Sequence, residues 1–299
     1  MKKLFCIIIA AVLILSGCER AEKNDGITVV TTVFPAYDFV RSIAGDEVNI
    51  KLLIKPGGDV HSYEPSPADI MAVNECDLFI YTGGENDSWV ETVLESAEDV
   101  RVLKMTDCVE LIEEIHHHES GEHAEPDEHV WTSPYNAIKI CNAICGELCE
   151  ADPENKELYK ANNLWYTGEL DKLDREIWDV VESGERNTLV FADRFAVRYF
   201  TERYGFEVMS AFPGCSGEAD ADPKTISELI EKVKAERIPV VFYAELSNTA
   251  MAETVKDATG AGMRLFHSCH NLSAEDFEAG RTYLDIMKDN LFYLKEAVN

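Results

Sequence analysis

Two short segments combine a histidine with carboxylates and prolines. HSYEPSP, at 61–67, contains His61, and DEHVWTSP, at 127–134, contains His129 directly after two carboxylates. Zinc binds imidazole nitrogen at about 2.0–2.1 Å and prefers four ligands in a tetrahedron. Neutral histidines suit zinc better than calcium or magnesium, which bind mostly oxygen, and the neighbouring carboxylates could orient each ring. The two segments therefore predict a metal site.

A histidine-rich stretch, HHHESGEHAEPDEH at 116–129, leads into the second segment. Besides His129 it contains His116, His117, His118 and His123. Its composition is typical of a mobile loop that attracts metal. Binding there should be loose, because each captured ion must also order the chain. The alternative is a solvated insertion with no role in binding.

The chain begins with the layout of a secretory leader. Lys2 and Lys3 precede an apolar run that ends in Leu-Ser-Gly before Cys18. The run is about a dozen residues long, which is short against the roughly 20 needed to span a bilayer. The layout predicts a signal peptide at 1–17, lipid attachment at Cys18 and a flexible lipidated tether at 18–26. We therefore expect an extracytoplasmic protein held at the outer face of the cell membrane.

The composition is strongly acidic. The net charge is −29, and loss of two lysines with the leader makes it −31. Such a charge argues against nucleic acid and anionic lipid headgroups as partners. It favours cations only diffusely, because most of the carboxylates should line solvated helix faces.

The nine cysteines fall into groups with different expected roles. Cys141, Cys145 and Cys149 recur every four residues on a predicted helix, which places them along one stripe and favours small core residues over a zinc cluster. Cys215 and Cys269 both follow predicted strands. A disulfide between them is reasonable in an extracytoplasmic protein, although sequence alone does not give the connectivity.

Short segments rich in β-branched residues form two runs of predicted strands that alternate with helices. This alternation predicts parallel sheets covered by helices on both faces. A helix should start at Ser66-Pro67, since serine is a good N-cap and proline suits the first helical position. The predicted strands are 27–34, 48–54, 77–83 and 100–105, then 188–193, 207–212, 239–245 and 263–268.

A long periodic segment separates the two runs. It begins at Asp152-Pro153 and reaches Ser183-Gly184, with apolar residues at near-helical spacing. About 30 helical residues make a rod of roughly 45 Å, whereas helices average only about 11–12 residues. The sequence thus predicts an α/β fold of two lobes, 27–151 and 185–299, joined by a linker helix at 152–184.

Together these motifs, with DRFAVRYF at 193–200 and Thr-Gly at 259–260, resemble the zinc and manganese solute-binding proteins of ABC importers, the ZnuA/AdcA group of cluster A-I. The resemblance runs from about Ile27 to the C-terminus. It implies two α/β lobes with one metal in the cleft between them, a membrane permease as partner, and a protein that acts as a monomer. It also implies that His61 and His129 are the first two ligands.

The next two ligand positions depart from that family pattern. Ala192 stands before Asp193-Arg194-Phe195, where the family has a histidine or glutamate, and alanine cannot coordinate. His267 stands where counting from Thr259-Gly260 places the final acidic ligand, so we expect His267 to be the third ligand. A water molecule or one of several side chains could be the fourth, namely Asp193, Glu218, Glu245 or His270.

The leading hypothesis is a zinc-binding lipoprotein that delivers Zn²⁺ to an ABC permease without catalysis; Mn²⁺ is less favoured. One alternative is an extracellular zinc hydrolase, because three histidines and an open position are also the pattern of catalytic zinc. Against it, the chain has no H-E-x-x-H motif and no separate residue clearly placed as general base. Another alternative is a metal-binding surface adhesin.

Overall fold

The computed structural model describes residues 26–95, 97, 100–118, 121–212, 214–215 and 223–299. The predicted leader, the predicted lipid site at Cys18 and the candidate ligand Glu218 lie outside these residues. Among the described helices, none combines the length and apolar character needed to cross a bilayer.

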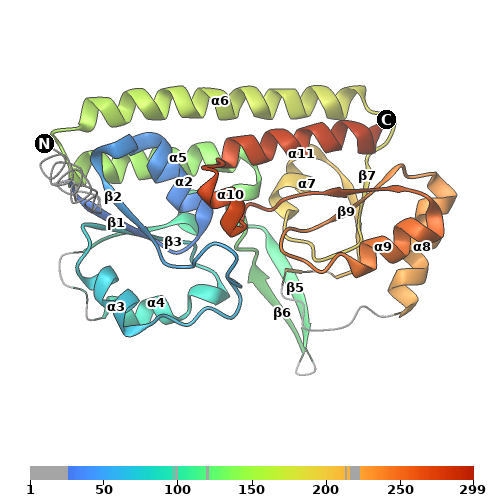
Figure 1. Ribbon diagram of the computed structural model, residues 1–299, viewed down its shortest axis with the longest axis horizontal. Helices are drawn as coiled ribbons and strands as arrows, with labels where there is room; N and C mark the ends of the chain where they lie inside the picture. The colour runs from blue at the N-terminus through green and yellow to red at the C-terminus, as the bar shows by residue number, and fades with distance from the viewer. Residues whose placement is uncertain (1–25, 96, 98–99, 119–120, 213, 216–222) are drawn as a thin grey trace, which may run out of the picture.

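The N-terminal lobe is built on a four-stranded parallel sheet with strand order β2-β1-β3-β4. Helices α2 and α5 cover one face, and α3 and α4 lie on the other (Figure 1). Helix α3 begins at Pro67 with Ser66 as N-cap, as predicted, and Asp69 completes a capping box. The elements are β1 (Thr28–Thr31), α2 (Phe34–Ala44), β2 (Asn49–Leu52), α3 (Pro67–Asn74), β3 (Leu78–Tyr81), α4 (Trp89–Leu94), β4 (Arg101–Lys104) and α5 (Pro134–Ala151).

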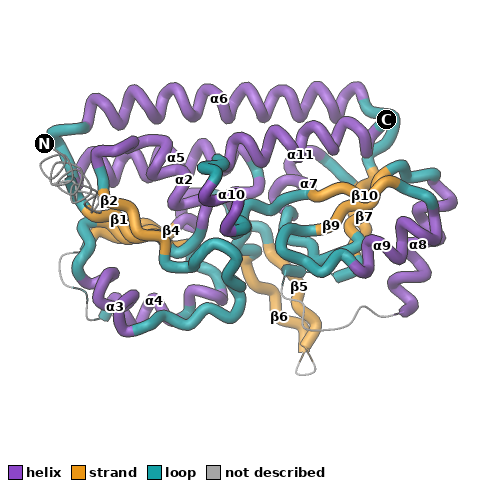
Figure 2. The backbone as a smooth tube through the Cα atoms, viewed as in Figure 1, coloured by secondary structure: helices purple, strands orange, loops and turns teal. Residues whose placement is uncertain are grey.

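The C-terminal lobe repeats this plan, with a parallel sheet of order β10-β9-β7-β8. All eight predicted strands are confirmed, and the two lobes lie side by side (Figure 2). The elements are β7 (Thr188–Phe191), α7 (Arg198–Tyr204), β8 (Glu207–Ser210), α8 (Pro223–Glu236), β9 (Val240–Tyr243), α9 (Ala250–Thr259), β10 (Gly262–Leu265), α10 (Ala274–Glu278) and α11 (Tyr283–Val298).

The histidine-rich stretch has a regular backbone. Instead of the loop expected from composition, β5 (Glu113–His118) and β6 (Gly121–Pro126) pair as an antiparallel hairpin, with His116 opposite His123 in register. The hairpin projects beside the region where the lobes meet (Figure 1). Short 3₁₀ turns complete the fold at Gly45–Glu47, Glu85–Asp87, Met105–Cys108 and Val130–Thr132.

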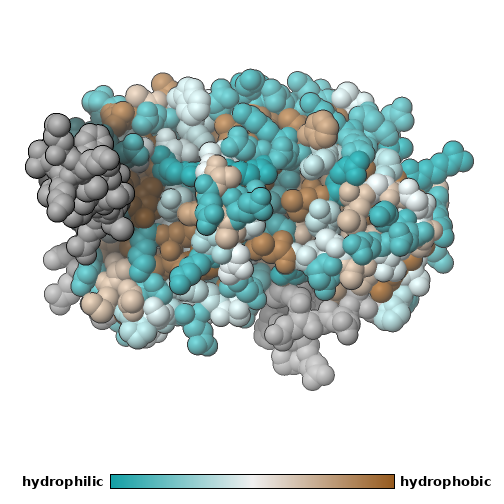
Figure 3. Space-filling model, in the orientation of Figure 1, coloured by the Kyte–Doolittle hydropathy of each residue, from teal (hydrophilic) through white to brown (hydrophobic). Residues whose placement is uncertain are grey.

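The predicted linker helix is α6 (Lys156–Ser183), which runs along both lobes and packs on α2, α5 and α11 (Figure 1). Its inward face includes Tyr166, Leu170 and Ile177, each at most 2% exposed. Leu164, which shares the sequence periodicity, is instead 76% exposed. The outer surface seen in Figure 3 is largely hydrophilic, in keeping with the acidic composition.

Helix α5 carries the cysteine stripe. Cys141, Cys145 and Cys149 are buried in the main core, which confirms their prediction as small core residues. A zinc cluster is not needed to explain their spacing, because the same helical face also buries Ile144 and Leu148.

Buried hydrogen bonds tie the C-terminal helix α11 to the N-terminal lobe. The backbone N–H of Tyr283 donates to Asp38 at 2.8 Å, and its hydroxyl donates to the carbonyl of Trp131 at 2.7 Å. Arg41 of α2 donates to Asp38 and also to the carbonyl of Arg281, at 3.0 Å. Because these groups have little access to water, their pairing holds the lobes in register.

The carboxylate of Asp174 anchors α6 to α7. Its removal should therefore destabilise the protein more than removal of an exposed carboxylate elsewhere on α6. The Asp174 carboxylate accepts two hydrogen bonds from Arg203 and one from the Tyr204 hydroxyl, all at 2.6 Å. Asp174→Ala should lower the free energy of unfolding by roughly 2–3 kcal/mol, because buried donors lose their acceptor. Asp171→Ala, on the same helix but 51% exposed, should change it by less than about 0.5 kcal/mol. Urea unfolding of the metal-free protein measures both, and equal losses would contradict the anchoring role.

Candidate metal centre

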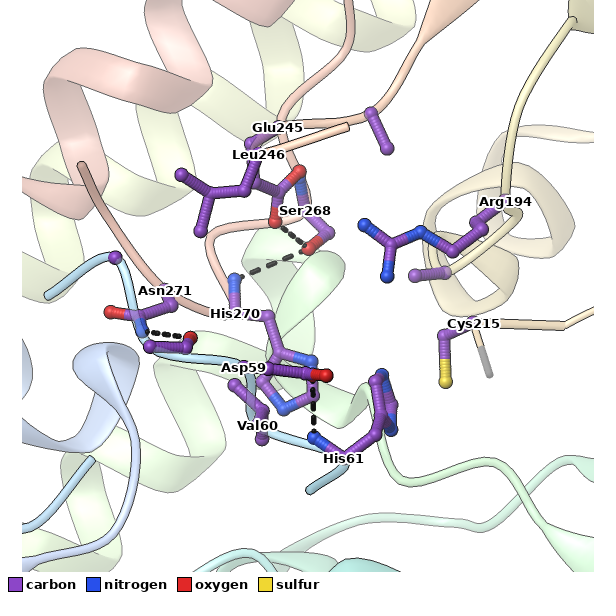
Figure 4. A pocket seen from close by; sticks show the side chains of 14 residues that line it. Asp59, Val60, His61, Arg194, Cys215, Glu245, Leu246, Ser268, His270 and Asn271 are labelled. Atoms are coloured by element: carbon purple, nitrogen blue, oxygen red, sulfur yellow. Dashed lines mark hydrogen bonds between the residues drawn. The ribbon is translucent and has the colours of Figure 1, made fainter. Parts of the chain in front are cut away.

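The loops at the carboxyl ends of the parallel strands converge on one cavity of about 230 Å³ (Figure 4). This is the edge at which open α/β sheets bind ligands. The N-terminal lobe contributes the segment after β2, and the C-terminal lobe contributes the segments after β7, β8, β9 and β10. The polar side chains that line it include His61, Arg194, Cys215, Glu245, His270 and Asn271.

His129 is held by a carboxylate two residues before it. Its Nδ1 lies 2.8 Å from Asp127 Oδ1, and both side chains are 2% exposed. The other ring nitrogen, Nε2, is buried and makes no hydrogen bond of ordinary geometry with the described residues. An imidazole whose Nδ1–H donates to a carboxylate presents Nε2 as a metal ligand, which is the usual arrangement in zinc sites. The pattern D-E-H thus encodes both the ligand and the group that orients it.

The charge environment of His129 is set by its neighbours. Burial alone would lower the pKa of His129, but the Cys215 sulfur and the Asp127 carboxylate outweigh burial and raise it well above its usual value. Burial alone would raise the pKa of Asp127, but His129 and Arg198 lower it. The Asp127 carboxylate is therefore kept ionised beside the imidazole.

His61 approaches from the N-terminal lobe. The Asn86 amide nitrogen lies 3.0 Å from His61 Nδ1 and also contacts Glu128 Oε1. Glu128 is 8% exposed, and its Oε2 has no hydrogen-bond partner among the described residues. Burial alone would lower the pKa of His61, but Cys215 and Glu128 raise it. Asn86 thus links the first histidine to the carboxylate beside the second.

His270 completes a group of three imidazoles. Its ring centroid lies 4.8 Å from that of His129 and 5.5 Å from that of His61. The indole of Trp131, which is fully buried, packs at 5.0 Å from His270. Burial, with the charges of His129 and His61, lowers the pKa of His270 well below its usual value, so this ring stays neutral and able to coordinate.

Cys215 faces the imidazoles across the cavity (Figure 4). Its Sγ and ligand atoms of His61 and Glu128 all lie within 4.8 Å of one another. Ligand atoms of Glu128, His129 and His270 form a second group, which also lies within 4.8 Å. Burial alone would raise the pKa of the Cys215 thiol, but His129 and His61 lower it. The two groups share Glu128 and together make one continuous cluster of metal-binding side chains.

Hydrogen bonds between the lobes fix the loops that carry these rings. The Asn271 amide donates to the carbonyls of Lys55 at 2.9 Å and Gly58 at 2.8 Å. The Trp131 indole N–H donates to the carbonyl of Ser268 at 2.8 Å. His61 and His270 therefore belong to loops that are bonded to each other across the cleft.

His267, which the sequence favours as third ligand, does not join this cluster. Its Nδ1 accepts a hydrogen bond from the backbone N–H of Cys269 at 2.9 Å, and its ring lines a different cavity. Cys269 adopts a left-handed conformation with φ 63°, which turns the chain between His267 and His270. The geometry thus favours His270, three residues later, over His267 as the third ligand.

The candidate carboxylates are engaged elsewhere. Asp193 accepts from the backbone N–H groups of Arg194 at 2.8 Å and Ala244 at 3.0 Å. Glu245 accepts from the backbone N–H of Ser268 at 2.9 Å and from its hydroxyl. These carboxylates shape the loops around the cavity, and neither belongs to a cluster of metal-binding atoms among the described residues.

The possible disulfide between Cys215 and Cys269 is not formed in the structure, where both residues are free thiols. Cys269 is completely buried in the main core, whereas Cys215 is partly buried at the cavity. Ala192, which stands where the family resemblance places a ligand, lies in a core, whereas Arg194 lines the cavity.

The sequence missed three residues of the site. From the sequence, Cys215 was considered only for a disulfide and Glu128 only as a carboxylate that could orient a ring, and Asn86 was given no role. A usable signal existed for Cys215, since it follows a strand whose parallel neighbours also end in site loops. Asn86 lies between glutamate and aspartate in a 3₁₀ turn, and nothing in that pattern distinguishes it from a surface residue.

Comparison with known proteins finds zinc-binding relatives. Zinc-binding lipoprotein AdcA of Streptococcus pneumoniae is 30% identical over all of this chain, which spans 62% of AdcA. High-affinity zinc uptake system protein ZnuA of Bacillus subtilis is 30% identical over 98% of this chain and 96% of its own length. The crystal structure of the Zn(II)-bound ZnuA-like domain of Streptococcus pneumoniae AdcA has a TM-score of 0.77 and 28% identity, covering 91% of this chain and 99% of that domain.

A family model described as "Zinc-uptake complex component A periplasmic" matches residues 29–297, which takes in both lobes, the linker helix and every described side chain of the cluster. The chain therefore belongs to the ZnuA family of zinc-uptake components.

Proposed function

We propose that this protein captures Zn²⁺ between its lobes and delivers it to an ABC permease in the membrane. The observation that carries the proposal is the group of three imidazoles, His61, His129 and His270, supplied by loops of both lobes. The unpartnered Nε2 of His129 adds to it, because a buried polar atom without a partner is costly unless a ligand satisfies it. Membership of the ZnuA family and the zinc-binding relatives give independent support.

The donor set favours zinc over manganese. Imidazole nitrogen suits zinc, whereas manganese prefers carboxylate, carbonyl and water oxygen. The carboxylates of Asp193 and Glu245 are bonded to backbone N–H groups, which leaves nitrogen as the main ligand type. Mn²⁺ is therefore expected to bind more weakly.

The proposed setting is the outer face of the cell membrane. Family membership makes the protein an extracytoplasmic solute-binding component. We further propose a lipid anchor at Cys18, action as a monomer, and lobes at 27–151 and 185–299 joined by a linker at 152–184. The family's role in uptake supports a transport component without catalytic activity, rather than the extracellular hydrolase or the adhesin.

Single substitutions should separate the ligands from their neighbours. His61→Ala, His129→Ala and His270→Ala should each weaken zinc binding by more than about 100-fold, since loss of a direct ligand should exceed the 10- to 100-fold effect of removing a supporting residue. Each should lose most of the zinc-induced thermal shift, because a ligand that binds only the folded state stabilises it by RT ln(1 + [L]/Kd).

His267→Ala is the matched control for His270→Ala, because both rings are buried in the same loop. The zinc-induced shift is measured against each variant's own metal-free melting temperature, which removes any direct effect on folding. His267→Ala should keep nearly the full shift. If His270→Ala kept the zinc-induced thermal shift and His267→Ala lost it, the third ligand would be His267, as first expected from the sequence.

Zinc binding should release protons and weaken in acid. The raised pKa of His129 means that the metal-free ring holds a proton more readily than a free histidine, whereas zinc requires the neutral ring. Lowering the pH from 8 to 6 should therefore weaken binding, and titration calorimetry in buffers of different ionisation enthalpy should detect the released proton. Asp127→Asn should reduce the release, because it removes a charge that raises this pKa. Affinity unchanged between pH 8 and 6 would contradict a histidine-based site.

The hairpin should contribute weak binding only. Deletion of residues 115–124, which contain His116, His117, His118 and His123, should leave the tight site's affinity nearly unchanged, because none of the three proposed ligands lies on that segment. The same deletion should remove additional weak zinc equivalents from a titration. A large fall in tight-site affinity would show instead that the hairpin supplies a primary ligand.

A further inference from the structure

The three imidazoles leave one position of a zinc tetrahedron to be filled, and Cys215 faces that position. Its Sγ lies within 4.8 Å of ligand atoms of both His61 and Glu128. It also contacts the cavity from the C-terminal lobe, opposite the loop that carries His61 (Figure 4). Adjacent ligands in a tetrahedron with Zn–N near 2.0 Å and Zn–S near 2.3 Å are separated by about 3.3–3.7 Å. The Cys215 sulfur and the His61 ligand atom therefore need only small movements to reach these separations.

The other fourth-ligand candidates are less well placed. The Asp193 carboxylate accepts two backbone hydrogen bonds, and the Glu245 carboxylate accepts from Ser268. Glu128 belongs to both groups of metal-binding atoms, but one of its carboxylate oxygens already accepts a hydrogen bond from the Asn86 amide. Coordination by Asp193 or Glu245 would require their hydrogen bonds to break, whereas the Cys215 sulfur already faces the rings.

The second free thiol near the cleft offers a natural comparison. Cys269 is completely buried in the main core, in the turn between His267 and His270, and belongs to no cluster of metal-binding atoms among the described residues. The two thiols therefore have different surroundings, although both stand in loops after strands of the same sheet.

We propose that the Cys215 sulfur is the fourth zinc ligand, giving a site of three imidazole nitrogens and one thiolate. This assignment rests on the proposed function and deepens it. On binding, the sulfur forms a bond to Zn²⁺ and any proton on the thiol passes to solvent, with no change of oxidation state. A thiolate favours zinc over manganese more strongly than a carboxylate would, since soft sulfur discriminates against metals that prefer oxygen. Cys215 thus adds to the preference for zinc that the three imidazoles already give.

Cobalt substitution under reducing conditions tests the assignment. Co²⁺ bound to thiolate absorbs strongly in the near ultraviolet, whereas Co²⁺ bound only to nitrogen and oxygen shows mainly weaker visible bands. The wild-type protein and the Cys269→Ala variant should show both absorptions. Cys215→Ser should bind Co²⁺ with visible bands and no thiolate band. It should also bind Zn²⁺ more than about 100-fold more weakly, as expected for loss of a direct ligand, and show a smaller preference for Zn²⁺ over Mn²⁺.

A second readout follows the thiol directly. Zn²⁺ should protect Cys215 from alkylation by iodoacetamide, as measured by mass spectrometry of the peptide. A wild-type protein that binds Co²⁺ without the thiolate band, or whose Cys215 is alkylated equally fast with and without Zn²⁺, would overturn the sulfur assignment and leave the proposed function intact. Failure to bind either metal would overturn both.

Discussion

The hydrogen bond between Asp127 and His129 is the interaction on which the proposed site depends. Both side chains are removed from water, so neither could keep its position without the other. The bond fixes which ring nitrogen carries the proton and leaves the other directed into the cleft. His270 then packs against this fixed ring and against Trp131, so its position follows from that of His129.

The parallel sheets bring the other side chains of the metal cluster to the same cleft. Parallel strands end at a common edge, so loops from distant parts of the chain meet there without needing to be long. Asn271 and Trp131 bond these loops across the lobes, and Asp38 with Tyr283 fixes the packing behind them. The metal cluster is therefore built on a cleft that is already held together by hydrogen bonds from both sides.

Much of the fold could be predicted because the spacing of apolar residues along the sequence indicates which side chains are buried. The strands are short, the central ones are mostly buried, as their β-branched runs indicate, and the cysteines of α5 fall on one buried stripe. The inward face of α6 was less predictable. Tyr159 is buried where Leu158 is 41% exposed, since either residue fits the apolar spacing and only tertiary packing chooses between them.

The site was predicted in part for a similar reason. His61 and His129 stand in motifs whose carboxylates and prolines mark them, and the structure brings both to the cluster. Choosing between His267 and His270 depended on the turn at Cys269, whose positive φ no residue pattern announces. The role of Cys215 stayed open because a thiol in a loop is compatible with a disulfide, a metal ligand or neither until its neighbours are known.

A crystal structure of the zinc-loaded protein, with anomalous differences collected on both sides of the zinc absorption edge, would test the proposed coordination most directly. We predict one strong zinc peak bonded to the ring nitrogens of His61, His129 and His270 at about 2.0–2.1 Å and to the Cys215 sulfur at about 2.3 Å. A peak bonded to His267, or one located outside the cleft, would contradict the site described above.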